Sequence, residues 1–167
     1  MDEGTKSASV LESIREHLRA HGVSFREVHH EPTPTSEDSA RARGESMSIG
    51  GKALLMKADE QFALFVLPAD RKVESSAIRR ELNCRKLRFA SRDELLEQTG
   101  LVPGSVPPFG KPILPFPLYL DAALAANEKI AFNAGSLTDS IIFTVADYLA
   151  ITTPERVFPF STGERKG

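Results

Sequence analysis

The sequence is poor in residues that mark several large protein classes. It has one cysteine, Cys84, no tryptophan, and no group of cysteines and histidines with the spacing of a structural zinc site. A lone cysteine excludes an intramolecular disulfide, and no apolar run approaches the roughly 18 residues that cross a membrane. The first residues lack the basic and then apolar order of a signal peptide. We therefore expect a cytoplasmic protein that contains no metal ion or other cofactor and does not contact a membrane.

Excess charge of either sign is also missing. The chain has 21 lysines and arginines against 23 acidic residues, a formal net charge of −2. Bulk positive charge is what lets a protein coat nucleic acid or an anionic membrane, so this mode of binding is excluded. With 167 residues, of which 41% are apolar, the chain can bury a substantial core. We predict one domain over residues 1–160 and a loose tail over 161–167.

The familiar short motifs of catalysis are absent as well. There is no GxSxG elbow, no phosphate-binding P-loop, no HExxH zinc motif and no GxGxxG after a strand. The reaction class must therefore be sought in less specific features.

Apolar spacing and turn residues predict helices and strands that alternate irregularly. Apolar residues three and four apart predict a helix over 9–21, and capping boxes predict helices beginning near Thr35 and at Ser91. Two apolar runs, 52–57 and 62–67, predict an antiparallel hairpin. Six of the eleven prolines lie within 103–117, which excludes a helix or an interior strand there. Further strands are expected at 23–28, 86–89, 116–120, 129–132 and 140–145, and further helices at 73–82 and 146–150. The pattern predicts an α+β fold.

Lys52 is the first candidate for chemistry. It follows two glycines and opens an apolar strand, so its ammonium group could project from the end of the sheet and bind a phosphate or carboxylate. A solvated lysine that protects a strand edge would give the same pattern.

Two glycine-bearing turns are the second candidate. The loop from Gly104 to Gly110 and the turn from Asn133 to Ser136 could present backbone N–H groups to a ligand oxygen, as in an oxyanion hole. Plain turn chemistry also requires proline and glycine at such places.

A basic segment is the third candidate. Residues 71–92 contain eight lysines and arginines against two glutamates, a net charge of about +6, which favours contact with a nucleic-acid backbone. A solvated helix face is the alternative. The adjacent His29 and His30 could supply a general base, although histidines before a proline are usually surface loop residues. Cys84 is expected to be a small packed side chain.

In their order along the chain, these features resemble the YbaK family of aminoacyl-tRNA deacylase domains, which also occur inserted in bacterial prolyl-tRNA synthetases. The resemblance rests on Lys52-Ala-Leu-Leu, Pro68-Ala-Asp-Arg, the loop from Gly104 to Gly110 and the turn Phe132-Asn-Ala-Gly. It implies a mixed, partly barrel-like β-sheet flanked by helices. It also implies an enzyme that hydrolyses the ester of a mischarged tRNA, with tRNA(Pro) carrying a wrong small amino acid as the leading substrate.

The resemblance also assigns roles to residues. It implies catalytic roles for Lys52, Gly104 and Gly110, of which Lys52 holds the terminal adenosine or its phosphate while backbone donors face the ester carbonyl. The predicted substrate-binding residues are His30, Pro108, Phe109, Asn133, Gly135, Ser136 and Ser140. The basic segment, and not the resemblance, supplies the predicted tRNA contacts Arg79, Arg80 and Arg85.

Such a protein would act in trans on the acceptor end of aminoacyl-tRNA, as a monomer or weak homodimer, with a cognate aminoacyl-tRNA synthetase as a further candidate partner. The alternative is a non-catalytic module of the same fold that binds tRNA or a nucleotide.

Overall fold

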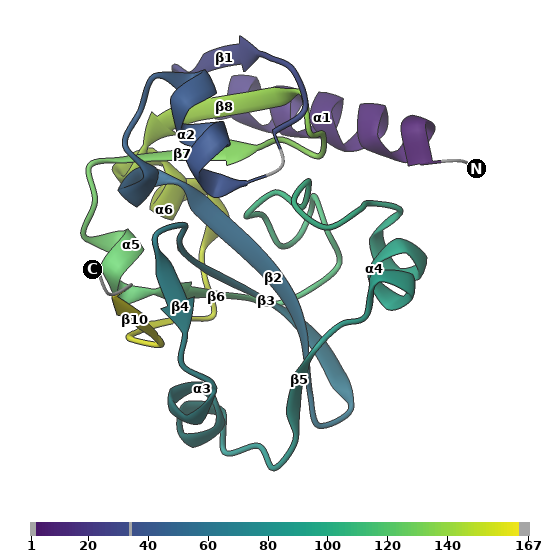
Figure 1. The fold of residues 1–167 in the computed structure, drawn as a ribbon, viewed down its shortest axis with the longest axis vertical. Coiled ribbons are helices and arrows are strands. Elements are labelled where there is room, and N and C mark those ends of the chain that lie inside the picture. Colours follow the sequence, from purple (N-terminus) through teal and green to yellow (C-terminus); the bar gives the residue numbers. More distant parts are fainter. Residues whose placement is uncertain (1–2, 34, 164–167) are drawn as a thin grey trace.

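The computed structural model describes residues 3–33 and 35–163, and its largest element is a five-stranded mixed sheet (Figure 1). The predicted hairpin forms the middle of this sheet, with pairing along the whole length of both strands. One outer strand adds antiparallel and two add parallel. The order across the sheet is β5 (Leu87–Phe89), β2 (Gly51–Ala58), β3 (Gln61–Pro68), β6 (Leu118–Asp121) and β9 (Arg156–Phe158).

The strand β3 is apolar almost throughout because both of its faces are buried. Successive side chains of a strand point to opposite faces of the sheet. Leu64 and Val66 lie in the larger hydrophobic core, whereas Phe65 and Leu67 lie in a second core on the other face. The sheet therefore separates two cores.

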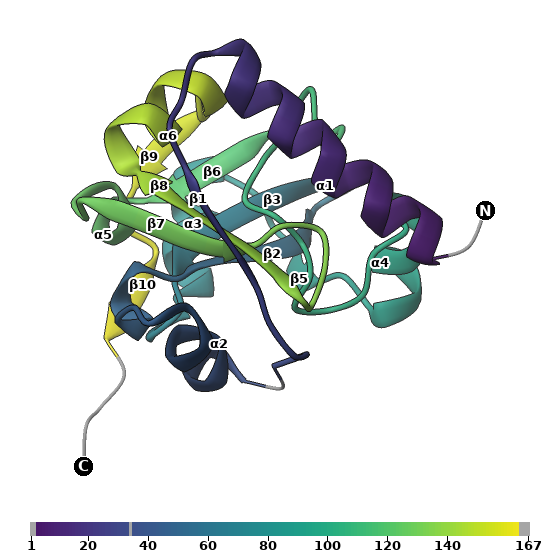
Figure 2. The same cartoon turned by 90° about the horizontal axis from the view of Figure 1, so that it is seen from above.

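A second, antiparallel sheet contains β1 (Arg26–His29), β8 (Asp139–Thr144) and β7 (Lys129–Asn133), in that order. The helix α1 (Glu3–Ala20) buries Val10, Ile14 and Leu18 in the larger core, as the three- and four-residue spacing predicted. Figure 2 shows α1 along one side of the molecule, with α6 (Val145–Thr152) beside its C-terminal end. The predicted mixture of helices and a mixed sheet is confirmed, and the described strands do not close into a barrel.

The predicted loose tail is wrong for its first three residues. Ser161–Gly163 form β10, which pairs antiparallel with β4 (Arg71–Val73) and precedes the tail residues that lie outside the described part of the chain. The strand β4 was also not predicted. It precedes α3 (Ser75–Leu82), which begins two residues later than expected.

The capping signals placed two helices correctly. Thr35 accepts a hydrogen bond from the Asp38 backbone N–H at the start of α2 (Ser36–Arg43), and Gly44 ends that helix with a left-handed φ of 72°. A complete capping box of Ser91 and Glu94 begins α4 (Arg92–Thr99).

The proline-rich segment forms no helix or strand, as predicted, but it is anchored. Val106, Phe109, Leu114 and Phe116 are buried in the larger core. Two short elements, η1 (Met47–Ile49) and α5 (Ala122–Ala125), complete the described chain. No helix within residues 3–33 and 35–163 is long and apolar enough to span a membrane.

Candidate active site

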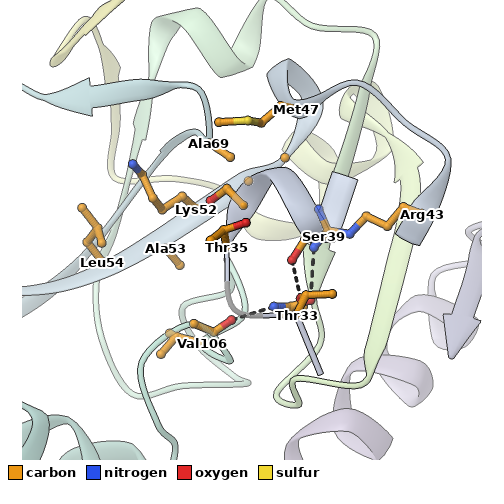
Figure 3. A pocket seen from close by; sticks show the side chains of 15 residues that line it. Thr33, Thr35, Ser39, Arg43, Met47, Lys52, Ala53, Leu54, Ala69 and Val106 are labelled. Carbon is orange, nitrogen blue, oxygen red and sulfur yellow. Dashed lines mark hydrogen bonds between the residues drawn. The ribbon is translucent and has the colours of Figure 1, made fainter. Parts of the chain in front are cut away.

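A cavity of about 230 Å³ opens at the amino-terminal end of β2, between α2 and the proline-rich loop (Figure 3). This volume lies below the roughly 300–1,000 Å³ of typical small-molecule sites, so the cavity suits one end of a larger substrate. None of the described residues that line it is acidic. They are Thr33, Thr35, Ser36, Ser39, Arg43, Met47, Gly50, Gly51, Lys52, Ala53, Leu54, Ala69, Gly104, Val106 and Asn133.

Lys52 enters the cavity from the second position of β2. Its side chain is half-buried, and its Nζ donates a hydrogen bond to the Arg71 carbonyl oxygen of β4 at 2.9 Å. The side chain is therefore held in place, unlike a freely solvated lysine at a strand edge. Figure 3 shows its ammonium group on the opposite side of the cavity from the Arg43 guanidinium.

Arg43, the last residue of α2, supplies a second positive charge. Its side chain is buried, with a residue exposure of 8%, and the ion pairs of the described residues do not include it. Burial lowers the pKa of Arg43 to about 10, so the guanidinium is still charged at neutral pH. This end of the cavity therefore has a fixed positive charge without a neighbouring described carboxylate.

Polar side chains connect Arg43 to the proline-rich loop. Arg43 donates from Nε to Ser140 Oγ at 2.9 Å and from Nη2 to Asn133 Oδ1 at 3.2 Å. Asn133 Nδ2 in turn donates to the Gly104 carbonyl oxygen at 2.8 Å. Asn133 therefore links α2, the end of β7 and the loop, and it fixes the wall of the cavity.

Ser140 and His30 lie behind this wall. Ser140 is fully buried and donates from Oγ to Asn133 Oδ1 at 3.2 Å. The His30 Nε2 atom lies 2.8 Å from the Ser140 Oγ, so among the described residues it is Ser140 that connects His30 to the cavity wall. Neither residue lines the cavity.

The loop from Gly104 to Gly110 offers fewer backbone N–H donors to the cavity than the sequence suggested. Pro107 and Pro108 have no N–H, the Ser105 N–H donates to the Val102 carbonyl, and the Phe109 N–H donates to the Pro107 carbonyl. Of the seven residues from Gly104 to Gly110, only Gly104 and Val106 line the cavity. An oxyanion site here cannot rest on the whole loop.

Several predicted site residues lie away from this cavity. Phe109 is in the larger core with its ring against Phe132 and Tyr148, and the Pro108 carbonyl accepts the Tyr148 hydroxyl at 2.7 Å. Gly110 packs against Phe116 and lines a different cavity. Their predicted roles in binding and catalysis stay predictions that this cavity does not support.

Gly135 and Ser136, in the turn after β7, also lie away from the cavity. Gly135 is buried against Val10 of α1, and Ser136 donates to the Asp139 carboxylate at 2.9 Å. Of the predicted site residues, Lys52, Gly104 and Asn133 come together in the cavity, and Ser140 and His30 stand behind it.

The predicted tRNA contacts lie at the other end of β2. Arg79 and Arg85 line a surface hollow that is bordered by three further basic residues and two acidic ones: Lys57, Lys86, Arg88, Asp59 and Glu60. Arg80 is exposed on α3 but does not line this hollow.

Sequence reasoning missed Arg43 and the hydroxyl-bearing residues of the cavity. Thr33 and Ser39 share a hydrogen bond of 2.6 Å beside the Arg43 guanidinium. In the sequence, Arg43 is one of two arginines in the last turn of a helix, where basic residues are common. Only the tertiary contact with β7 and β8 distinguishes it.

A smaller, more apolar cavity of about 140 Å³ adjoins the first. The two share Ala53, Leu54, Gly104 and Val106, and the smaller cavity adds Phe89, a residue that is 53% exposed.

Residues 30–151 match the family model of the aminoacyl-tRNA editing domain. The chain belongs to the aminoacyl-tRNA editing family. It is 35% identical over 163 residues to the multifunctional Ser/Thr-tRNA deacylase ProXp-y of Escherichia coli K12, an alignment that covers 94% of this chain and 96% of that protein. It is 30% identical over 117 residues to the proline–tRNA ligase of Shouchella clausii, covering 70% of this chain but 20% of the ligase.

A solved structure has the same fold. It is described as a proposed trans-editing enzyme for prolyl-tRNA synthetase, and it superposes with a TM-score of 0.78 at 24% identity, covering 98% of this chain and 99% of that one. The family match confirms the predicted resemblance, while the roles of the site residues stay predictions.

Proposed function

We propose that this editing-family protein is a trans-acting hydrolase that removes a wrong small amino acid from tRNA, with the cavity at Lys52 as its active site. The observation that carries the proposal is the convergence of Lys52, Gly104 and Asn133 on one small polar cavity. The deacylase relative of E. coli supports an ester of tRNA as the substrate.

Serine and threonine are the amino acids that the cavity suits best. Thr33, Thr35, Ser36 and Ser39 give its wall hydroxyl groups that match a hydroxylated side chain, and the volume of about 230 Å³ favours a small residue. The E. coli relative is named for seryl- and threonyl-tRNA, while the prolyl-tRNA ligase relative keeps tRNA(Pro) as the leading tRNA.

The reaction needs little machinery because an aminoacyl ester is already activated. Water adds to the acyl carbon, the bond from that carbon to the ribose oxygen breaks, and the ribose oxygen takes a proton. The products are the free amino acid and tRNA with a free terminal hydroxyl. Positioning the ester and stabilising the negative charge on the acyl oxygen are sufficient tasks for the protein.

The remaining surfaces fit the rest of the substrate. Lys52 offers its ammonium group to the terminal nucleotide, and Phe89 of the adjoining cavity offers an aromatic face on which a base can stack. The basic hollow at Arg79 and Arg85 would contact the phosphates of the acceptor stem. Action beside a synthetase and localisation in the cytoplasm are part of the same proposal.

A panel of charged tRNAs tests the proposal. The purified protein is incubated with seryl-, threonyl-, alanyl- and prolyl-tRNA, each on tRNA(Pro) and on a second tRNA, and the remaining ester is counted. We expect seryl and threonyl esters to disappear faster than in buffer and prolyl-tRNA(Pro) to persist. If no ester disappears faster than in buffer while the protein still binds tRNA, the non-catalytic binding module is the correct alternative.

A further inference from the structure

Arg43 has N–H groups that make no hydrogen bond to the described residues and can donate to a ligand in the cavity. A guanidinium carries five N–H groups, and the bonds to Ser140 and Asn133 use one on Nε and one on Nη2. Nη1 has no hydrogen-bond partner among the described residues. Every fully buried side-chain nitrogen or oxygen of these residues does have a hydrogen-bond partner, so Nη1 is not fully buried. The Nη1 group therefore faces the cavity that Arg43 lines.

This donor is fixed before any ligand arrives. Two hydrogen bonds hold the guanidinium plane, and burial removes most of the solvent around it. The backbone packs closely on the same side: a Cβ on Gly50 would lie 3.6 Å from Nη1 and 2.9 Å from the Ala69 Cβ. A preorganised, desolvated donor is most effective toward an atom that gains negative charge during a reaction.

Building on the proposed function, we infer that Arg43 is a catalytic residue whose Nη1 group donates to the acyl oxygen of the aminoacyl ester. The proline-rich loop has only Gly104 and Val106 at the cavity, so backbone donors alone give weak support to that oxygen. As water adds to the acyl carbon, the oxygen becomes negative, and Arg43 stabilises it more strongly than it stabilised the neutral ester.

The terminal phosphate is the other anionic oxygen source in the substrate, and it fits the Lys52 side better. The phosphate and the amino acid leave the terminal ribose at different positions, and a cavity of about 230 Å³ suits only one end of the nucleotide. Lys52 and Arg43 lie on opposite sides of this cavity. The buried Arg43 side therefore takes the acyl group, and the more exposed Lys52 side takes the nucleotide.

Single-turnover deacylation of seryl-tRNA by Arg43→Met, Arg43→Lys and the matched control Arg41→Met tests this role. Arg41 is two residues away on the same helix, is exposed, and pairs only with Asp38 among the described side chains. We expect Arg43→Met to lower the saturating rate by about 100-fold or more with little change in the half-saturating enzyme concentration. Arg43→Lys keeps the positive charge but loses the planar set of guanidinium N–H donors, so we expect its saturating rate to fall by about tenfold or more. Arg41→Met should react like the wild type.

A second substrate distinguishes contact with the acyl oxygen from contact with the terminal phosphate. Seryl-adenosine has the ester but no phosphate, so an equal loss with seryl-adenosine and seryl-tRNA supports contact with the acyl oxygen. A loss confined to seryl-tRNA, or a change in affinity with an unchanged saturating rate, overturns the inference. If Arg43→Met does not fold, as judged by circular dichroism, Arg43→Lys carries the test with the same outcomes. An inactive wild type refutes the proposed function, whereas an active wild type with fully active Arg43 variants refutes only this inference.

Discussion

Among single residues, Gly135 occupies a position that other amino acids cannot take without strain. Its φ is 78°, and a Cβ there would lie 2.7 Å from the Val10 Cγ1 of α1. The family resemblance assigned this glycine to the amino-acid pocket, but the structure uses it to let α1 pack closely on the turn after β7. A glycine in a sequence motif does not reveal whether a bound ligand or a closely packed helix requires the absence of a side chain at that position.

Gly135→Ala is therefore expected to destabilise the protein, by about 2–4 kcal/mol, because it combines a left-handed backbone with a clash against a buried side chain. Thermal or urea unfolding measures this loss. Gly22→Ala is the matched control, since Gly22 has a φ of 67° and a Cβ added there would have no atom within 4 Å. It should cost only about 1 kcal/mol, the backbone part alone. Equal losses in the two variants would show that the Val10 contact is unimportant.

At the scale of secondary-structure elements, the short strand β10 supports the active site from outside. Its residues pair with β4, and the Ser161 side chain accepts a hydrogen bond from Arg71 Nε at 2.6 Å and donates one to Asp121. The Arg71 carbonyl is the acceptor that holds Lys52. Residues 161–163, which were expected to belong to a loose tail, thus stabilise β4, and β4 in turn positions the predicted catalytic residue Lys52.

Truncation after Phe160 removes β10 and tests this connection. We expect a loss of stability of about 1–3 kcal/mol and, because Lys52 loses a fixed partner, a fall in the deacylation rate on the order of tenfold. Ser161→Ala keeps the backbone pairing with β4 and loses only the hydroxyl contacts, so its losses should be smaller. A truncated protein with full activity would show that β4 holds Lys52 without help.

Local signals explain which elements were predictable. The caps of α2 and α4 and the two strands of the central hairpin are encoded by neighbouring residues, and the structure places them within one or two residues of the prediction. The strands β4, β9 and β10 contain three residues each and exist only because a distant segment pairs with them. The same holds for Arg43, whose role depends on Asn133 and Ser140, 90 and 97 residues away.

Across the whole molecule, β2 connects two surfaces that both carry basic side chains. Lys52 lies at the cavity and Lys57 at the basic hollow, and the five steps of strand from one to the other span about 17 Å. Figure 1 shows β2 running from α2 to the end of the molecule that contains β5 and α3. A chain with a net charge of −2 can therefore present a local basic surface at the far end of the strand that begins at its active site.

Reversal of one charge in this hollow should weaken tRNA binding. Arg85→Glu is expected to lower the affinity and to reduce the slope of log affinity against log salt by about one, because one phosphate contact is lost. Fluorescence anisotropy over a series of salt concentrations measures both quantities. The control Arg19→Glu makes the same charge change on the exposed face of α1, where Arg19 pairs with Glu12. An identical salt slope for Arg85→Glu and the wild type would make the hollow a merely solvated surface.

The central claim is that the cavity at the start of β2 is where the ester is hydrolysed. Its most direct test is the single-turnover rate of seryl-tRNA deacylation by Lys52→Ala beside Lys111→Ala, an exposed lysine at a different cavity. We predict a loss of about 100-fold or more for Lys52→Ala and a wild-type rate for Lys111→Ala. A Lys52→Ala protein that is folded and deacylates seryl-tRNA as fast as the wild type would contradict the claim.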